Sequence, residues 1–418
     1  MVTRPGLLLV LALSPAVLSA NPLWRFCFGG TPCPAGAIHV ASAAAYDPAI
    51  GYGFEEGVAA PRSAPGFYFS ARLPKEGNYD VTVTVGDPRR SADTTVKAEL
   101  RRLYAIHVRT AAGASKTLHF VVNLRTPAIP GGGVVRLKPR EKTGEFWDWD
   151  DKLTLEFDGA SAAVEAVEIS PAPPMPTVYI AGDSTVCDQP YEPYASWGQM
   201  LTYFFGPGVA IANHAESGES LRSFIGERRL AKLDTLMKPG DYLFIQSGHN
   251  DQKERGPGIG ALTSYKRELA HFVADARAHG VTPVLVTPVS RRTFGPDGTI
   301  VNSLGDFPLA VREVAREQHT ALIDLNAMSE TLYNTLGPSG AVNLFALANG
   351  KREGTHHNDY GAYEIARCIV TGIRQNGLPL AKFLKPDAGT FDPQHPDPFA
   401  SFPVPPSPRA ADIKPYGN

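Results

Sequence analysis

The sequence predicts an α/β domain, a parallel sheet with helices on both faces, that follows a separate region of β structure. Three observations support this fold class. Residues 21–172 contain short segments rich in β-branched and aromatic residues, which is typical of strands. From residue 177 onward, short apolar runs alternate with helical patterns, as in parallel α/β sheets. A proline cluster separates the two regions and predicts a linker at residues 173–176.

The first region, residues 21–172, is expected to form a β-sandwich or a jelly roll. It offers many short candidate strands separated by glycine-containing turns, and it has no helical pattern. The expected strands cover residues 67–73, 79–85, 95–100, 104–109, 118–124, 152–157 and 163–169.

The second region, residues 177–386, is expected to hold the doubly wound sheet. Its strands are predicted at residues 177–181, 242–246, 281–286 and 320–324, and its helices at 265–279, 308–318 and about 360–374. Ligands in such folds bind at the carboxyl ends of the strands, so catalytic residues are expected there. Residues 387–418 are rich in proline and are expected to form an extended tail over the surface.

The amino terminus predicts a secretory signal peptide over residues 1–20. Arg4 supplies a positive charge, residues 7–13 form a short apolar core, and the small residues Ser19 and Ala20 offer a cleavage site. We therefore expect a secreted or periplasmic protein. The apolar run is too short to span a bilayer, and a net charge of −2 gives no indication of nucleic acid or an anionic membrane as a partner.

Four cysteines are present, and an oxidising compartment permits disulfides. Cys27 and Cys33 flank a short turn, so a disulfide and two buried thiols are equal alternatives for this pair. The sequence does not decide the pairing of Cys187 and Cys368.

Candidate catalytic residues follow the predicted strands. Ser184 ends a Gly-Asp-Ser turn after the strand at 177–181, which suits an exposed nucleophile. Gly218 and Asn250 lie in later loops and can offer N–H groups to an oxyanion. Glu353 precedes His356 by three residues in an expected loop, where a carboxylate can orient an imidazole, and the adjacent His357 competes for the same role. Each motif taken alone is as well explained by an ordinary turn.

Together and in this order, the four motifs resemble the SGNH hydrolases, also called the GDSL family. Four blocks are similar to its rhamnogalacturonan acetylesterase branch: Ala181-Gly-Asp-Ser-Thr-Val, Tyr194-Ala-Ser-Trp-Gly-Gln, Gln246-Ser-Gly-His-Asn-Asp and Thr355-His-His-Asn. This resemblance implies a flavodoxin-like catalytic domain and a galactose-binding-like β-sandwich before it. It implies Ser184 as nucleophile, His356 as base and an oxyanion hole formed by Ser184, Gly218 and Asn250. Glu353 stands where the family usually has Asp.

The expected function is therefore a secreted serine esterase that removes acetyl groups from a plant cell-wall polysaccharide, with pectic rhamnogalacturonan as the first candidate. Acetylxylan esterase, lipase and thioesterase are alternatives within the same family, and a non-catalytic carbohydrate-binding protein is an alternative of another class. The mechanism requires no cofactor, and no Cys/His cluster has the spacing of a metal site. The oligomeric state and the acetyl position are left open.

Overall fold

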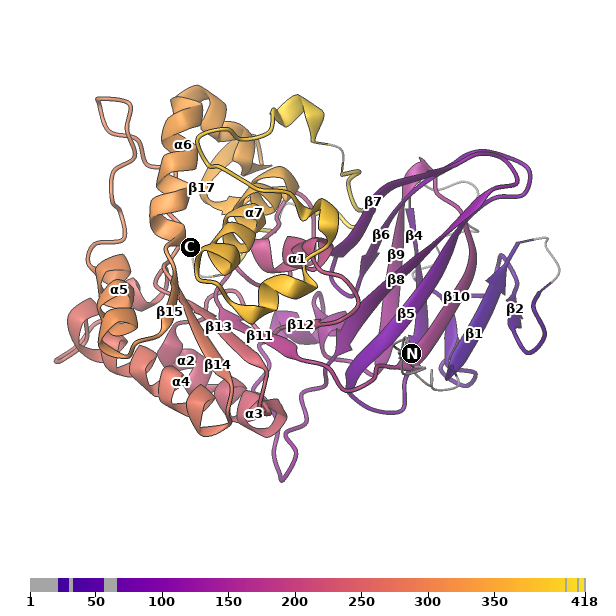
Figure 1. The fold of residues 1–418 in the computed structure, drawn as a ribbon, viewed down its shortest axis with the longest axis horizontal. Coiled ribbons are helices and arrows are strands. Elements are labelled where there is room, and N and C mark those ends of the chain that lie inside the picture. The colour runs from indigo at the N-terminus through magenta and orange to yellow at the C-terminus, as the bar shows by residue number, and fades with distance from the viewer. Residues whose placement is uncertain (1–21, 30–32, 56–65, 403, 412, 417–418) are drawn as a thin grey trace, which may run out of the picture.

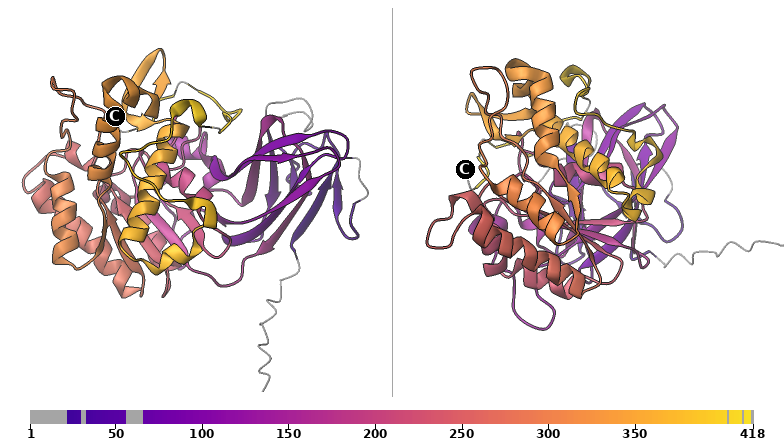
Figure 2. Two further views of the ribbon diagram at one scale, coloured as in Figure 1. Left: turned by 45° about the horizontal axis from the view of Figure 1, so that its top comes forward. Right: turned by 60° about the vertical axis from the view of Figure 1, so that its left-hand side comes forward.

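The computed structural model describes residues 22–29, 33–55, 66–402, 404–411 and 413–416. The predicted signal peptide lies outside these residues. Two regions lie side by side: the β strands of the first region form one lobe, and an α/β domain forms the other (Figures 1 and 2).

The first region contains two five-stranded sheets, and every strand predicted for it is present. In both sheets the pairing is antiparallel except between β1 and β2. One sheet has the order β2 (Ile38–Val40), β1 (Trp24–Phe28), β10 (Val164–Pro171), β5 (Gly77–Gly86) and β8 (Ser115–Leu124). The other has the order β3 (Tyr52–Phe54), β4 (Gly66–Arg72), β9 (Lys152–Ser161), β6 (Ala92–Ala98) and β7 (Arg102–Thr110).

The buried side chains of these two sheets form one hydrophobic cluster. Alternate residues of β5, among them Val81 and Val83, face this cluster, as expected for a strand with one buried face. Phe26 from the first sheet packs edge-on against Phe69 from the second, with ring centroids 4.9 Å apart. The more specific prediction of a galactose-binding-like sandwich stays a prediction.

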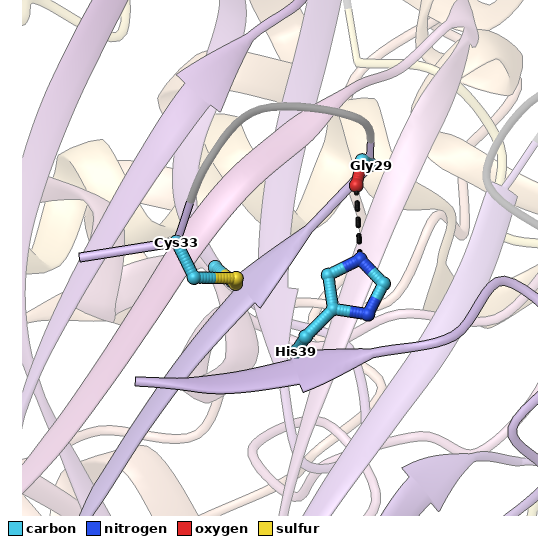
Figure 3. Close-up of a disulfide and its surroundings, with 4 residues drawn as sticks. Gly29, Cys33 and His39 are labelled. Atoms are coloured by element: carbon cyan, nitrogen blue, oxygen red, sulfur yellow. Dashed lines mark hydrogen bonds between the residues drawn. A yellow bond between two sulfur atoms is a disulfide. The ribbon is translucent and has the colours of Figure 1, made fainter. Parts of the chain in front are cut away.

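Cys27 and Cys33 form a disulfide, which decides between the two alternatives left open for this pair. Figure 3 shows the bridge at the end of β1, next to His39, whose side chain is hydrogen-bonded to the carbonyl oxygen of Gly29 at 3.1 Å. Cys187 and Cys368 are buried free thiols.

The α/β domain is built on a parallel five-stranded sheet. Its order is β12 (Ala210–Asn213), β11 (Thr177–Gly182), β13 (Tyr242–Gln246), β14 (Thr282–Val286) and β15 (Ala321–Ile323). Numbered within the domain, this order is 2-1-3-4-5, the flavodoxin-like arrangement. Strand β12 is added on one side of β11, and β13 and the later strands are added on the other side. Ligands of such sheets bind where the strand order reverses in this way, beyond the carboxyl ends of the strands.

Helices cover both faces of this sheet, as predicted. Successive residues of β11 alternate between two clusters: Val178 and Ile180 face one, and Tyr179 and Ala181 face the other. The first cluster includes helices α1 (Trp197–Leu201), α6 (Leu325–Ala341) and α7 (Asp359–Gln375). The second includes α2 (Leu221–Gly226), α3 (Arg229–Leu236), α4 (Lys266–Ala278) and α5 (Phe307–Glu317). Among the described residues, no helix has both the length and the apolar character needed to cross a membrane.

Charged side chains join the two regions. Arg102 of β7 donates to Asp188 at 2.6 Å, and Arg229 of α3 donates to Glu141 at 2.6 Å. After α7 the chain returns to the first region, where Tyr68 Oη lies 3.0 Å from Ser407 Oγ (yellow and purple ribbons in Figure 1). The C-terminal part of the described chain therefore contacts the β region in which the described chain begins.

Candidate active site

Ser184 lies directly after β11, in a tight turn. A Cβ at Gly182 would lie 2.8 Å from the carbonyl oxygen of Gln246 on the neighbouring strand, so only glycine fits there. Asp183 stabilises the turn by accepting from the backbone N–H of Thr185 at 2.9 Å. The carbonyl of Ser184 accepts from the side chain of Gln189 at 2.7 Å, which fixes the backbone of the serine.

The predicted histidine reaches this serine, and the predicted acid reaches the histidine. His356 Nε2 lies 2.9 Å from Ser184 Oγ, and His356 Nδ1 lies 3.1 Å from Glu353 Oε2. The expectation of an exposed nucleophile is wrong for this structure, because Ser184 and His356 are both buried, with 3% and 1% of their surfaces exposed. The three side chains therefore form the acid–base–nucleophile chain that the sequence predicts.

The expected loop around Glu353 is instead a strand. Residues Lys351–His357 form β17, which pairs antiparallel with β16 (Phe345–Ala348). In a regular strand, residues three apart point to opposite faces. The register of this pair shifts between Phe345 and Leu347, so the strand is irregular next to the site. This irregularity is compatible with the contact between Glu353 and His356 on one side.

His357 does not contact Ser184 among the described hydrogen bonds. Its Nε2 lies 2.7 Å from the hydroxyl of Tyr333, and its ring stacks on Phe345 at 4.8 Å. Burial lowers the pKa of His357 to about 3, with the charges of His356 and His249 adding to the effect. Of the two adjacent histidines, His356 therefore has the position of a base and His357 lies in the core.

The surroundings of His356 and Glu353 lower the pKa of both side chains. Burial lowers the pKa of His356 below its ordinary value of 6.5, and Glu353 offsets only part of that effect. Burial also opposes ionisation of Glu353, but hydrogen bonds and charges from His356 and Lys414 outweigh it and lower the pKa of Glu353. At neutral pH the pair is therefore a neutral imidazole next to a carboxylate, the state that a general base requires.

The predicted oxyanion donors lie in loops that follow neighbouring strands. Gly218 has φ +81°, a conformation that favours glycine. Asn250 donates one N–H to the carbonyl of Glu219 at 2.9 Å, and its Oδ1 accepts from Lys253 at 3.0 Å. These two contacts fix the orientation of the amide, which still has a second N–H to offer.

Two cavities of about 350 and about 540 Å³ adjoin this site. The smaller includes Tyr194, whose ring lies edge-on to His356 at 5.9 Å, and the larger includes Gly218. Arg140 and Tyr416 line both. The walls combine aromatic rings with charged groups, and they come from the first region, the α/β domain and the C-terminal segment.

Several residues next to the site were not predicted from the sequence. Arg140 comes from the first region, and Lys414 lies 3.2 Å from Glu353 although it belongs to the proline-rich tail. Neither residue follows a predicted strand or belongs to a motif, so no local signal indicates its position. Tyr194, by contrast, precedes the Ser-Trp-Gly-Gln segment that leads into α1.

Comparisons with known proteins identify the family of the chain. A model of the GDSL-like lipase/acylhydrolase family matches residues 180–362. The chain belongs to this family, the GDSL or SGNH hydrolases, which are carboxylic-ester hydrolases.

Individual relatives match either half or most of the chain. Rhamnogalacturonan acetylesterase RhgT of Bacillus subtilis is 40% identical over 50% of this chain and 93% of its own length. A rhamnogalacturonan acetylesterase of Emericella nidulans is 33% identical over 53% of this chain and 94% of its own. A crystal structure of the Bacillus subtilis protein YxiM covers 85% of this chain and 99% of that chain, with 27% identity and a TM-score of 0.47.

Proposed function

We propose that this protein is a polysaccharide O-acetylesterase that acts on acetylated rhamnogalacturonan. The observation that carries the proposal is the contact chain from Ser184 Oγ through His356 to Glu353, with spacings of 2.9 and 3.1 Å. The substrate class is supported by relatives that are named as rhamnogalacturonan acetylesterases and are 33–40% identical. The other residues around the site have to be consistent with both the ester hydrolysis and the polysaccharide substrate.

In the proposed reaction, Ser184 Oγ attacks the acetyl carbonyl carbon while His356 Nε2 takes the hydroxyl proton. The negative charge on the carbonyl oxygen is stabilised by the N–H groups of Ser184, Gly218 and Asn250. His356 then gives the proton to the sugar oxygen, which leaves as a hydroxyl group. Water attacks the acetyl-serine, its proton passes to His356 and then to Ser184, and acetate is released.

The lining of the two cavities supports a carbohydrate rather than a long acyl chain. Tyrosine rings offer apolar faces, and Arg140, Glu145 and Gln189 offer hydrogen bonds at fixed positions. A lipase would instead bury its acyl chain against a continuous apolar surface. This observation favours the sugar ester among the reactions of the family.

Secretion is part of the proposal. The Cys27–Cys33 disulfide supports it, because such bonds persist in oxidising compartments. Amino-terminal sequencing of the protein recovered outside the cytoplasm tests this part. We expect the mature chain to begin at Asn21, and a chain that still begins at Met1 would contradict the prediction.

The substrate is tested by measuring acetate release from acetylated rhamnogalacturonan and from acetylated xylan at equal acetyl content. We expect faster release from rhamnogalacturonan. Ser184→Ala is the control, and it should lower the rate by several orders of magnitude because loss of the nucleophile disables the whole triad. Equal turnover by the folded Ser184→Ala variant would reject the esterase mechanism, and a preference for xylan would reject only the substrate.

A further inference from the structure

The C-terminal segment, residues 413–416, lies against the proposed catalytic residues. Just before it, the chain is held to the α/β domain by two backbone bonds: Glu192 N–H donates to Arg409, and Ala411 N–H donates to Glu192. Pro415 is buried, and Tyr416 lines both cavities. A stretch from the end of the described chain thus forms part of the wall of the site.

Lys414 is the member of this segment that touches the catalytic chain. Its Nζ lies 3.2 Å from Glu353 Oε1, while the other carboxylate oxygen, Oε2, lies 3.1 Å from His356 Nδ1. The carboxylate therefore bridges a lysine and the imidazole. Glu353 is mostly buried, with 12% of its side chain exposed, whereas Lys414 is 50% exposed.

We propose that Lys414 is a positioning residue of the esterase, which holds the Glu353 carboxylate in the orientation that serves His356. The inference rests on the proposed function, because it assigns Lys414 a role in the same reaction. Lys414 touches neither Ser184 nor His356 among the described contacts, so it acts through Glu353.

The contacts of Glu353 with both His356 and Lys414 also account for a glutamate at position 353. A glutamate has one more rotatable bond than an aspartate, and a free carboxylate on a longer side chain has more orientations to lose when it binds His356. A second charged hydrogen bond at Oε1 restrains that freedom. An aspartate at position 353 would be one methylene shorter, and it would have to meet both His356 and Lys414 from farther back.

Tyr416 anchors the segment. A Cβ placed on Gly218 would lie 2.6 Å from the Tyr416 ring, so this ring packs directly on the glycine backbone. The Arg140 guanidinium lies 5.6 Å from the centroid of the same ring, within the range of a cation–π contact. Tyr416 thus fixes a chain position two residues after Lys414.

Several other charged groups lie near Glu353 and His356 and contribute to the electrostatics of these two side chains. Glu353 faces His356 and Lys414, and its backbone carbonyl accepts from Arg292 at 3.2 Å. His356 faces Glu353, His249 and Asp183. Lys253 is a further cation close to Lys414, and of Lys253, Arg292 and Lys414 only Lys414 contacts the Glu353 carboxylate among the described contacts. Removing Lys414 changes the electrostatics of the pair while leaving the other groups in place.

The test is the pH profile of kcat/KM for p-nitrophenyl acetate in the wild type, Lys414→Met and Lys414→Arg. Without the cation, protonation of Glu353 and His356 becomes easier. The fall of kcat/KM on the acid side of the pH profile, called the acid limb here, should therefore lie about half a pH unit higher in Lys414→Met. This is the size expected for loss of a half-exposed charge. Lys414→Arg keeps the charge and should retain the wild-type limb. Lys382→Met is the matched control, because Lys382 is an exposed lysine that lies against Phe383.

A second variant tests the anchor. Tyr416→Ala should move the acid limb in the same direction as Lys414→Met, and Tyr416→Phe should leave it unchanged, because the ring and not the hydroxyl makes the contacts. In the wild type, raising the salt concentration should move the limb toward that of Lys414→Met, since an exposed charge is screened. A lysine with only a structural role would change stability and leave the limb in place.

Two results would overturn the inference. One is an acid limb of Lys414→Met that coincides with the wild type from about pH 4 to about pH 8. The other is an increase of kcat/KM in Lys414→Met and Tyr416→Ala without a shift of the limb, which would make the segment an inhibitory cover. Failure of the proposed function is a separate outcome, because it requires that the wild type itself lacks Ser184-dependent turnover.

Discussion

The guanidinium of Arg101, in the turn between β6 and β7, lies 2.8 Å from the carboxylate of Asp359 at the start of α7. The same side chain donates to the carbonyl of Tyr194 at 2.6 Å. Arg101 is 2% exposed, so a residue of the β region is buried inside the α/β domain. Tyr194 in turn contacts His356, which connects the β region to the catalytic residues.

The first prediction concerns this buried arginine. Arg101→Met should lower the free energy of unfolding by about 3–5 kcal/mol, because the buried carboxylates lose their partner. Arg109→Met removes an exposed arginine of the neighbouring strand and should cost less than about 1 kcal/mol. Urea denaturation of both variants measures the difference, and equal midpoints would show that the Arg101 contacts contribute no stability.

A related prediction concerns the β region as a whole. A fragment that begins at Thr177 should not fold, because Asp188, Arg229 and Lys232 would lose the partners that the first region supplies. Circular dichroism and gel filtration of the fragment measure this. A folded fragment with wild-type activity would mean that the β region serves only to hold substrate or has no role in catalysis.

Asn250 provides a test of the oxyanion hole. Asn250→Ala should lower kcat by about 10²–10³ and change KM much less, since the donor acts mainly in the transition state. Asn302→Ala, at an exposed asparagine, is the control for loss of an amide. An effect on KM alone would assign Asn250 to substrate binding.

Substitutions of Glu353 test whether this residue is the third member of the triad. Glu353→Gln keeps the size but removes the charge, and it should lower kcat at least about tenfold and alter the pH profile. Glu353→Asp should retain more activity than Gln if its shorter side chain still reaches His356. Glu330→Gln is an exposed control. Wild-type activity of Glu353→Gln across the pH range would leave a Ser184–His356 dyad.

The pH dependence of the wild type follows from His356. The base must be neutral, and burial lowers the pKa of His356 below 6.5, so the midpoint of the fall in kcat/KM on the acid side should lie below pH 6.5. Steady-state kinetics on a small ester measure this limb. His357→Gln should leave its midpoint unchanged, whereas a shift in that variant would contradict the assignment of His357 to the core.

The strands and the order of the motifs are predictable because they depend on local patterns. Every predicted strand of both regions is present, and Ser184 lies two residues after β11, whereas strand β12 of the parallel sheet was not predicted. Helix α6 (Leu325–Ala341) was missed. A Gly337-Pro338 pair interrupts its pattern, and Gly337 has φ +65° inside the helix. Strand β17 was taken for a loop, although Asn349-Gly350 just before it is a strong hairpin signal.

The remaining parts of the site depend on contacts that no local pattern indicates. Arg101 ends a turn in which Glu99 and Arg101 have positive φ, and Arg102 begins β7. Nothing in the residues themselves indicates that they would be buried against Asp359 and Asp188. Lys414 reaches Glu353 from a proline-rich segment that sequence patterns describe only as extended. Such pairs are set by the packing of whole regions rather than by spacing along the chain.

The return of the chain to its first region has a consequence for the order of assembly. Lys97 of β6, fully buried beside Asp158 of β9, donates to the carbonyl of Pro405, which is made 308 residues later. A polypeptide emerges from the ribosome amino terminus first. The Lys97–Pro405 contact therefore forms only after the α/β domain between these two residues has been synthesised. Lys414 follows Ser184, Glu353 and His356 in the sequence, so these three side chains leave the ribosome before the segment that contacts Glu353.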